Sequence, residues 1–304
     1  MNKRTDSTIN LQGSMTALVT PFRGGDVDWA CMEKLVDRQI GGGTDWLVPC
    51  GTTGESPTLT SAEHDRLLAT VIARAGGRRP VMAGSGTNAT TETIRRTRSA
   101  AAAGAQAALI VAPYYNRPTD EGLFRHYAAV AEAVDLPIVM YNVPIRTGVS
   151  ISNDVIVRLR NQYPHIVGLK HATGSVDGVT DLLDRCDITV LSGDDNITWP
   201  LMALGARGVI SVISNLRPSL MKALVDAGLS GDVTAARRHH GEVFALAAAL
   251  GRFGPNPIPI KTAMALQGLC TEEFRLPLCP MEESARASLE RLLRRAPERE
   301  PVTA

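Results

Sequence analysis

The sequence lacks the long apolar segments and the excess of one charge that are typical of membrane and nucleic-acid binding proteins. In its 304 residues, no apolar run approaches the ~18 residues that a membrane-spanning helix needs. The first twenty residues contain no sustained apolar core like that of a signal peptide. The 32 basic residues are balanced by 31 acidic ones, whereas nucleic-acid binders usually carry a basic surplus. We therefore expect a cytoplasmic protein that binds neither nucleic acid nor membrane.

Patterns for metal ions and disulfide bonds are missing as well. The five cysteines are widely spread without a CxxC pair, and the six histidines form no HExxH motif. The adjacent pair His239 and His240 lies in an arginine-rich polar stretch, which is typical of a solvated helix face. Because zinc sites and disulfide frameworks need closer spacing, we expect reduced thiols and no metal site.

Nucleotide-binding motifs are absent or misplaced. No GxxxxGK[ST] string occurs, which excludes a P-loop as far as a motif can exclude it. A GxGxxA string at residues 84–89 follows the third predicted strand rather than the first, and no acidic residue ends a strand about twenty residues later. The sequence thus gives a dinucleotide site little support.

What the sequence does contain is a regular alternation of short Val- and Ile-rich runs with longer segments of helical periodicity. The expected strands span residues 15–19, 46–49, 80–83, 107–112, 137–141, 166–170, 189–192 and 208–212. The expected helices span residues 28–40, 61–75, 90–103, 121–134, 153–162, 176–185, 196–204 and 218–227. Eight strand–helix units predict an α/β fold, a closed parallel (β/α)8 TIM barrel, with an open doubly wound sheet as the alternative. Thr60 and Glu63 have the spacing of a capping box, and Gly104 is a helix stop signal.

After residue 230 the pattern contains helices only, over residues 233–250, 258–269 and 281–295. Pro255, Pro257 and Pro259 separate the first of these helices from the second. We expect residues 1–230 to form the barrel that carries the active site. Residues 231–304 would form a helical extension that covers a face or joins subunits, and their polar, proline-containing end from Arg295 is expected to be disordered.

Lys170 is the most informative residue at the predicted strand ends, where the functional loops of a parallel barrel emerge. The chain has only five lysines, and this one closes a buried apolar strand. Burial disfavours the charged form of an amine, and a neutral amine attacks a ketone to form a Schiff base. The alternative is a lysine that reaches out to solvent or pairs with Asp194 or Asp195.

The loop that follows the second predicted strand has the sequence GTTGE at residues 51–55. Its two glycines allow backbone N–H groups to turn inward, with the hydroxyls of Thr52 and Thr53 between them. Such a loop ahead of a helix is suited to a carboxylate or an oxyanion. An ordinary tight turn, with the threonines as caps, and a phosphate site are the alternatives.

Three of the five tyrosines, Tyr114, Tyr115 and Tyr141, also fall at predicted strand ends. The phenols of Tyr115 and Tyr141 can pass protons if a hydrogen-bonded chain links them to Thr52, although tyrosines at a barrel mouth are often packing groups. Arg146 can bind a carboxylate in a bidentate manner, or it is simply a surface arginine.

Six strings, in this order along the chain, resemble those of the dihydrodipicolinate synthase family of the pyruvate-dependent class I aldolases. They are GTTGES at 51–56, PYYN at 113–116, YNVP at 141–144, GLK at 168–170, LSGDD at 191–195 and GVISV at 208–212. The resemblance extends from residue 16 to residue 261. It implies a synthase that condenses pyruvate with L-aspartate-4-semialdehyde to give (4S)-4-hydroxy-2,3,4,5-tetrahydrodipicolinate, for lysine and diaminopimelate synthesis. No metal or organic cofactor is implied.

The resemblance also implies which residues react. Lys170 would form the Schiff base with pyruvate, and Tyr141 would donate and accept protons. Thr52 and Tyr115 would complete a proton relay. In relatives, the tyrosine at the position of Tyr115 enters the site of a neighbouring subunit, so the resemblance implies a homo-oligomer, commonly a tetramer built as a dimer of dimers.

Substrate-binding residues follow from the same resemblance. Thr53 and the main chain of Ile210 would hold pyruvate, and Gly193 would shape the pocket. Arg146 would receive the carboxylate of aspartate semialdehyde.

In feedback-inhibited relatives, lysine binds a cleft between subunits. The corresponding positions here are Ser56, Pro57, Ser61, His64, Asn88, Glu92 and Tyr114. Ser61 replaces a common histidine and Pro57 a common alanine, so inhibition by lysine stays an open question. A further departure is His171, which follows the Schiff-base lysine where many relatives carry glutamate.

Two alternative functions remain. N-acetylneuraminate lyase and the 2-keto-3-deoxy sugar-acid aldolases share the lysine, the tyrosine and the GxTGE loop. Arg146 favours the synthase, because an acceptor with a carboxylate needs a cationic partner and a polyol does not. A non-catalytic, ligand-binding barrel would predict a broken site, yet each expected catalytic side chain is present.

Overall fold

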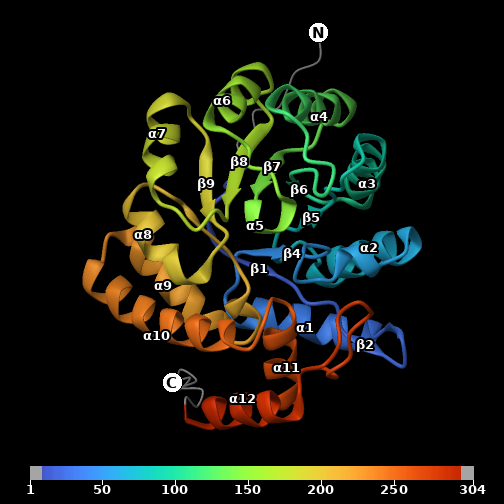
Figure 1. Ribbon diagram of the computed structural model, residues 1–304, viewed down its shortest axis with the longest axis vertical. Helices are drawn as coiled ribbons and strands as arrows, with labels where there is room; N and C mark the ends of the chain where they lie inside the picture. Colours follow the sequence, from blue (N-terminus) through green and yellow to red (C-terminus); the bar gives the residue numbers. More distant parts are fainter. Residues whose placement is uncertain (1–8, 296–304) are drawn as a thin grey trace.

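The computed structural model describes residues 9–295, and its centre is a barrel of eight parallel strands (Figure 1). The strands are β1 (Gly13–Ala17), β4 (Trp46–Val48), β5 (Met82–Gly84), β6 (Ala107–Val111), β7 (Ile138–Asn142), β8 (Ile166–His171), β9 (Thr189–Ser192) and β10 (Gly208–Ser211). Their order is β4-β1-β10-β9-β8-β7-β6-β5, and a parallel bridge from Leu47 to Val81 joins the two ends of the sheet. The predicted (β/α)8 fold is confirmed, and the doubly wound sheet is wrong.

Helices follow the strands and surround the barrel (Figure 1). They are α1 (Trp29–Gly41), α2 (Ser61–Ala75), α3 (Thr90–Ala103), α4 (Asp120–Ala133), α6 (Asn153–Gln162), α7 (Asp177–Arg185), α8 (Thr198–Ala203) and α9 (Pro218–Ser230). The capping box of α2 forms as predicted, since Thr60 Oγ1 accepts from the Glu63 N–H and the Glu63 carboxylate accepts from the Thr60 N–H. Gly104 ends α3 at a φ of 93°, a conformation that glycine adopts without strain.

The inside of the barrel is filled by apolar side chains. Met15, Trp46, Met82 and Val139 belong to one buried cluster that also contains Tyr141 and Ile210. The strands therefore enclose a packed core, as is usual for this fold, and leave chemistry to their carboxyl ends.

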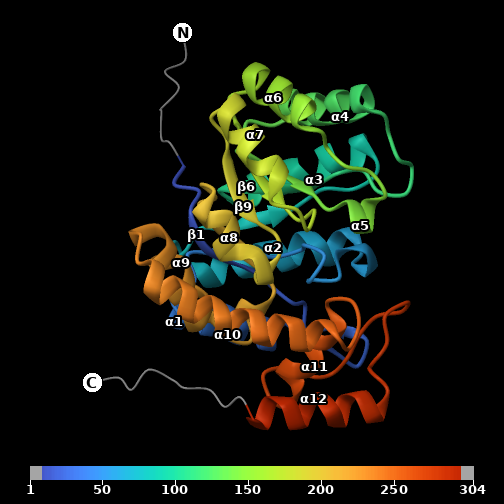
Figure 2. The same ribbon diagram turned by 60° about the vertical axis from the view of Figure 1, so that its left-hand side comes forward.

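Three further helices lie on the side of the barrel that carries α1 and α9 (Figures 1 and 2). They are α10 (Val233–Gly251), α11 (Ile258–Leu266) and α12 (Glu283–Arg295). One apolar cluster joins Leu35 of α1, Leu224 of α9, Val243 of α10, Ile260 of α11 and Leu289 of α12. The predicted boundary at residue 230 stays a prediction, and the disordered tail predicted beyond Arg295 lies outside the described residues.

Short elements differ from the predicted pattern. The sequence pattern did not predict the hairpin of β2 (Phe22–Arg23) and β3 (Asp26–Val27), the one-turn helix α5 (Pro144–Thr147), or the 3-10 turns η1 (Ser56–Thr58) and η3 (Ile213–Asn215). The helix predicted over 196–204 is divided into η2 (Asp195–Ile197) and α8, so that Pro200 lies in the first turn of α8, where proline is tolerated. Segments of two to four residues are too short to show periodicity. Among the described residues, no helix combines the length and apolar character needed to cross a bilayer.

Candidate active site

Lys170 and Tyr141 lie side by side at the carboxyl end of the barrel. They are register partners on the parallel strands β8 and β7. The Lys170 Nζ atom lies 4.1 Å from the centroid of the Tyr141 ring. Lys170 is 5% exposed and Tyr141 is 7% exposed, so this lysine does not reach out to bulk solvent. The structure brings the expected nucleophile and the expected proton carrier into contact.

Gly193 leaves room for the Lys170 side chain. A Cβ atom at this position would lie 3.1 Å from Lys170 Cε and 2.6 Å from the Cβ of Ala172. Any side chain would therefore press on the amine-bearing chain, which is why glycine is required. The neighbouring Asp194 is mostly buried; burial raises the pKa of its carboxyl group, and the charge of Lys170 acts in the opposite direction.

The GTTGE loop begins and ends in left-handed backbone conformations. Cys50 has a φ of 60° and Glu55 a φ of 53°, and both values are uncommon for residues other than glycine. Within the loop the Gly54 N–H donates to the Gly51 carbonyl, and the Glu55 N–H donates to the Thr52 carbonyl, each at 3.1 Å. Thr53 is 4% exposed, whereas Thr52 is half-buried. The loop is a compact turn that follows β4, and its binding of a carboxylate or an oxyanion stays a prediction.

Tyr115 lies in the loop between β6 and α4 and is 90% exposed. Its backbone has a φ of 73°, and its N–H donates to the Thr147 carbonyl at 3.4 Å. Ile145, on α5, is 93% exposed. The structure therefore does not bring Tyr115 into the interior cluster that contains Tyr141.

Arg146 is an exposed residue of α5. Its Nη2 atom donates to the main-chain carbonyl of Asn256 at 2.9 Å. A guanidinium has five N–H donors, so this bond leaves donors for a carboxylate. Ile210 is fully buried on β10, where it belongs to the interior cluster, and it pairs in register with Met15 of β1.

The positions that resemble a lysine cleft lie on three neighbouring segments. Ser56 begins η1, His64 is on α2, Asn88 precedes α3, Glu92 is on α3, and Tyr114 follows β6. His64 is fully buried, and its Nε2 atom lies 2.9 Å from the Gly84 carbonyl. Ser56, Asn88, Glu92 and Tyr114 are half-buried.

Glu92 already has two intramolecular partners. Its carboxylate accepts hydrogen bonds from Arg95 and from Arg96 at 2.8–3.0 Å. These bonds, that of Arg95 first, lower the pKa of Glu92 to about 2.

The His171 ring contacts the segment that follows β8. Its Nε2 atom lies 2.7 Å from the Ser175 carbonyl and 2.9 Å from Thr173 Oγ1. His171 therefore stabilises the loop that follows β8.

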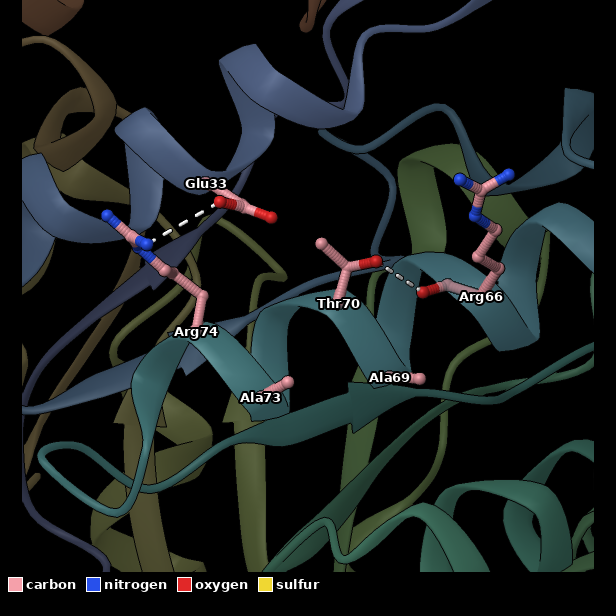
Figure 3. A pocket seen from close by; sticks show the side chains of 6 residues that line it. All are labelled: Glu33, Arg66, Ala69, Thr70, Ala73 and Arg74. Atoms are coloured by element: carbon pink, nitrogen blue, oxygen red, sulfur yellow. Dashed lines mark hydrogen bonds and ion pairs between the residues drawn. The ribbon is translucent and has the colours of Figure 1, made fainter.

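A surface hollow of about 450 Å³ lies between α1 and α2, away from these residues (Figure 3). Glu33, Arg66, Thr70 and Arg74 line it, together with two alanines. Arg74 is 3.5 Å from Glu33, and Thr70 Oγ1 donates to the Arg66 carbonyl at 2.9 Å. The charged groups that line the hollow are partly paired. None of the lining side chains carries a primary amine, so the hollow offers no Schiff-base chemistry.

Two structural partners of the site were missed by the sequence analysis. Asp195 does not pair with Lys170; its Oδ2 atom accepts from the N–H groups of Val212 and Ile213 at 3.1 and 3.0 Å, and so fixes the turn after Ile210. Burial raises the pKa of Asp195, and these hydrogen bonds oppose the shift. Glu55, the last residue of GTTGE, forms an ion pair with Lys261, which lies within the helix predicted over residues 258–269.

Comparison with known proteins agrees with this geometry. Residues 10–296 match the model of the dihydrodipicolinate synthetase family. The 4-hydroxy-tetrahydrodipicolinate synthase of Pelobacter propionicus is 50% identical over 280 residues, which cover 91% of this chain and 96% of that protein. The corresponding enzyme of Geobacter sulfurreducens is 48% identical over 285 residues, which cover 93% and 98%.

Solved structures show the same likeness. Dihydrodipicolinate synthase from Aquifex aeolicus has a TM-score of 0.92 and 44% identity, covering 94% of this chain and 98% of that one. The chloride-inhibited enzyme of Acinetobacter baumannii, solved in complex with pyruvate, has a TM-score of 0.91 and 45% identity, covering 94% and 98%. The chain therefore belongs to the dihydrodipicolinate synthetase family.

Proposed function

We propose that this chain is a 4-hydroxy-tetrahydrodipicolinate synthase that condenses pyruvate with L-aspartate-4-semialdehyde through a Schiff base on Lys170. The observation that carries the proposal is the buried contact between the Lys170 amine and the Tyr141 ring, 4.1 Å apart at paired strand ends. Membership of the family supports the same reaction.

In the first step the Lys170 amine attacks the keto carbon of pyruvate. Loss of water gives an imine, and loss of a methyl proton converts it into an enamine. The imine nitrogen is the electron sink, so the carbon that reacts next carries the electron pair. Tyr141 is the proton carrier, with Thr52 and Tyr115 as its relay, and no metal or organic cofactor takes part.

In the second step the enamine carbon attacks the aldehyde of aspartate semialdehyde, whose carboxylate binds Arg146. The amino group of the bound product then attacks the imine carbon and displaces Lys170. This closes the ring, releases (4S)-4-hydroxy-2,3,4,5-tetrahydrodipicolinate and regenerates the free amine. Thr53 and the main chain of Ile210 hold the pyruvate end.

Borohydride reduction tests the Schiff base directly. In the presence of pyruvate it should add one reduced pyruvyl group to the peptide that contains Lys170. Lys170→Arg should abolish the label, and Lys222→Arg, which changes a surface lysine on α9, should not. Label on any other lysine would refute the assignment.

The acceptor is tested by turnover with aspartate semialdehyde against sugar-derived aldehydes. The synthase is supported if the unsubstituted protein prefers aspartate semialdehyde and the Arg146→Ala variant loses this preference while it still forms the imine. A preference for sugar aldehydes would support a sister aldolase instead.

A homo-oligomer, a tetramer built as a dimer of dimers, is part of the proposal. The exposure of Tyr115 and Ile145 supports it, because the Tyr115 N–H joins the two segments through the Thr147 carbonyl, and neighbouring exposed apolar side chains mark interaction surfaces. If Tyr115 acts in a neighbouring subunit, inactive Lys170→Ala and Tyr115→Phe proteins should regain activity when mixed and reassembled. Failure to regain activity in mixed oligomers would refute a shared site.

A further inference from the structure

Lys261 and Glu55 form a completely buried ion pair between α11 and the GTTGE loop. Lys261 Nζ donates to Glu55 Oε1 at 2.7 Å, and both side chains have no exposed surface. The two residues are 206 positions apart in the sequence. The pair is therefore a direct tie between the C-terminal helices and the loop that carries Thr52 and Thr53.

Two phenylalanine rings lie beside the Lys261 amine. Lys261 Nζ lies 4.2 Å from the centroid of the Phe22 ring and 5.0 Å from that of Phe274. The second oxygen of Glu55 accepts from the Arg275 N–H at 3.3 Å. Desolvating two charges costs much of what their attraction provides, so a buried pair is weak evidence for stability alone. A role in fixing the position of the GTTGE loop explains why two charged residues are buried at this position.

The loop needs such an anchor because its own backbone is strained. Cys50 and Glu55, at its two ends, both have positive φ. Apart from its internal turns, the loop is tied by Thr20 Oγ1, which donates to the Gly54 carbonyl at 2.6 Å. Glu55 is the residue through which α11 acts on the loop.

The same C-terminal segment contacts a second part of the site. Asn256, five residues before Lys261, accepts the hydrogen bond from Arg146 through its main-chain carbonyl. Residues 256–261 thus contact both Arg146 and the Thr52–Thr53 loop through Glu55. This double contact would be unnecessary if the C-terminal helices only covered apolar surface.

We propose that Lys261 is a positioning residue, which acts through Glu55 to hold Thr52 and Thr53 in place for the reaction of the lysine-bound pyruvate. It does not touch the substrate. The inference rests on the proposed function, because it assigns to Thr52 the relay and to Thr53 the binding of pyruvate.

The test uses the full-length protein with the double substitution Glu55→Gln and Lys261→Met. This variant removes both charges and keeps similar side-chain volumes, whereas Lys261→Met alone leaves an uncompensated buried carboxylate and unfolds more easily. Turnover is measured per active site, with the sites counted by borohydride trapping of pyruvate. We expect the double variant to fold and its turnover per trapped site to fall by up to ~10²-fold, since an ångström of misplacement can cost that much. The KM for pyruvate should rise.

The matched control is Arg286→Ala, which breaks the 2.7 Å pair between Arg286 and Glu272 within the C-terminal extension. It should lower the melting temperature and leave turnover per site unchanged. If the double variant does not fold, Lys261→Arg alone replaces it, because arginine keeps a cation opposite Glu55 but changes the geometry of the pair, and a several-fold loss of turnover is still expected.

The inference would be overturned if the folded test variant, either the double variant or its replacement, had the same turnover per site and the same KM for pyruvate as the unsubstituted protein. A folded variant that traps less pyruvate would support it, since Lys170 is unchanged. If the unsubstituted protein itself traps no pyruvate, the proposed function fails first. The two failures are therefore distinguishable.

Discussion

The substitution Gly193→Ala tests whether free space beside Lys170 is required for imine formation. The added Cβ would lie 2.6 Å from the Cβ of Ala172, 3.1 Å from the His171 carbonyl oxygen and 3.1 Å from Lys170 Cε. Carbon atoms in good contact are about 3.5–4.0 Å apart, so the overlap with Ala172 is roughly 1 Å. Two of the three neighbours are fixed by the backbone, and Lys170 is the only flexible one.

Relief of the overlap with Ala172 therefore displaces the end of β9 by about 1 Å, and the new methyl group also presses on the lysine side chain. A displacement of that size at a reacting group can lower the rate ~10²-fold. Overpacking of this kind costs a further ~1–3 kcal/mol of stability. We expect imine formation to slow by about two orders of magnitude and the melting temperature to fall.

The assay is timed borohydride quenching with pyruvate, followed by mass spectrometry of the Lys170 peptide. Gly241→Ala on α10 is the control, because a Cβ there meets no atom within 4 Å. The reasoning would be wrong if Gly193→Ala formed the imine at the unsubstituted rate with an unchanged melting temperature.

The remaining predictions concern protons and charges. Tyr141→Phe keeps the ring beside Lys170, so borohydride trapping should persist while turnover falls ~10²–10⁴-fold; an unchanged turnover would contradict the relay. Because Glu92 already binds Arg95 and Arg96, L-lysine should inhibit only weakly in steady-state assays, and strong inhibition would contradict this. The hydrogen bond from Arg275 lowers the pKa of Glu63 from 4.5 to about 2, so its stabilisation is present above pH 4.5 and disappears as the pH falls through 2. In urea unfolding, Glu63→Gln should therefore lose less free energy of unfolding than the unsubstituted protein as the pH falls, by up to about 3 kcal/mol. If the free energies of unfolding of the two proteins changed in parallel with pH, the pair of Glu63 and Arg275 would not contribute.

The sequence predicted the barrel well because its helices are long enough to show a period, and its short strands are Val- and Ile-rich runs between them. The helices over residues 61–75, 90–103 and 153–162 and the strand over 189–192 have the predicted bounds. Capping residues such as Thr60 and Glu63 mark such boundaries locally. The hairpin at residues 22–27 and α5 are equally short but lie outside the alternation of apolar runs and helices, and for that reason they were missed.

Site residues at strand ends were predictable for a related reason. The topology of a parallel barrel brings all strand ends to one face, so Lys170 and Tyr141 could be placed together without coordinates. Their contact at 4.1 Å agrees with that reasoning. Tyr115 is different, because it is 90% exposed in the single chain and its role in a neighbouring subunit stays a prediction.

The partners of charged side chains were the part of the structure that the sequence predicted least well. Glu55 and Lys261 are separated by 206 residues, and nothing in the local pattern of either indicates that both are buried. Glu92 shows the converse case: the residue type matches a lysine-binding position, yet Arg95 and Arg96 already satisfy its carboxylate. A carboxylate that already has cationic partners gains little from another cation, because the new pair must replace hydrogen bonds that exist. Residue identity therefore predicts which chemistry is available at a position, whereas the tertiary contacts decide whether the group is free to perform it.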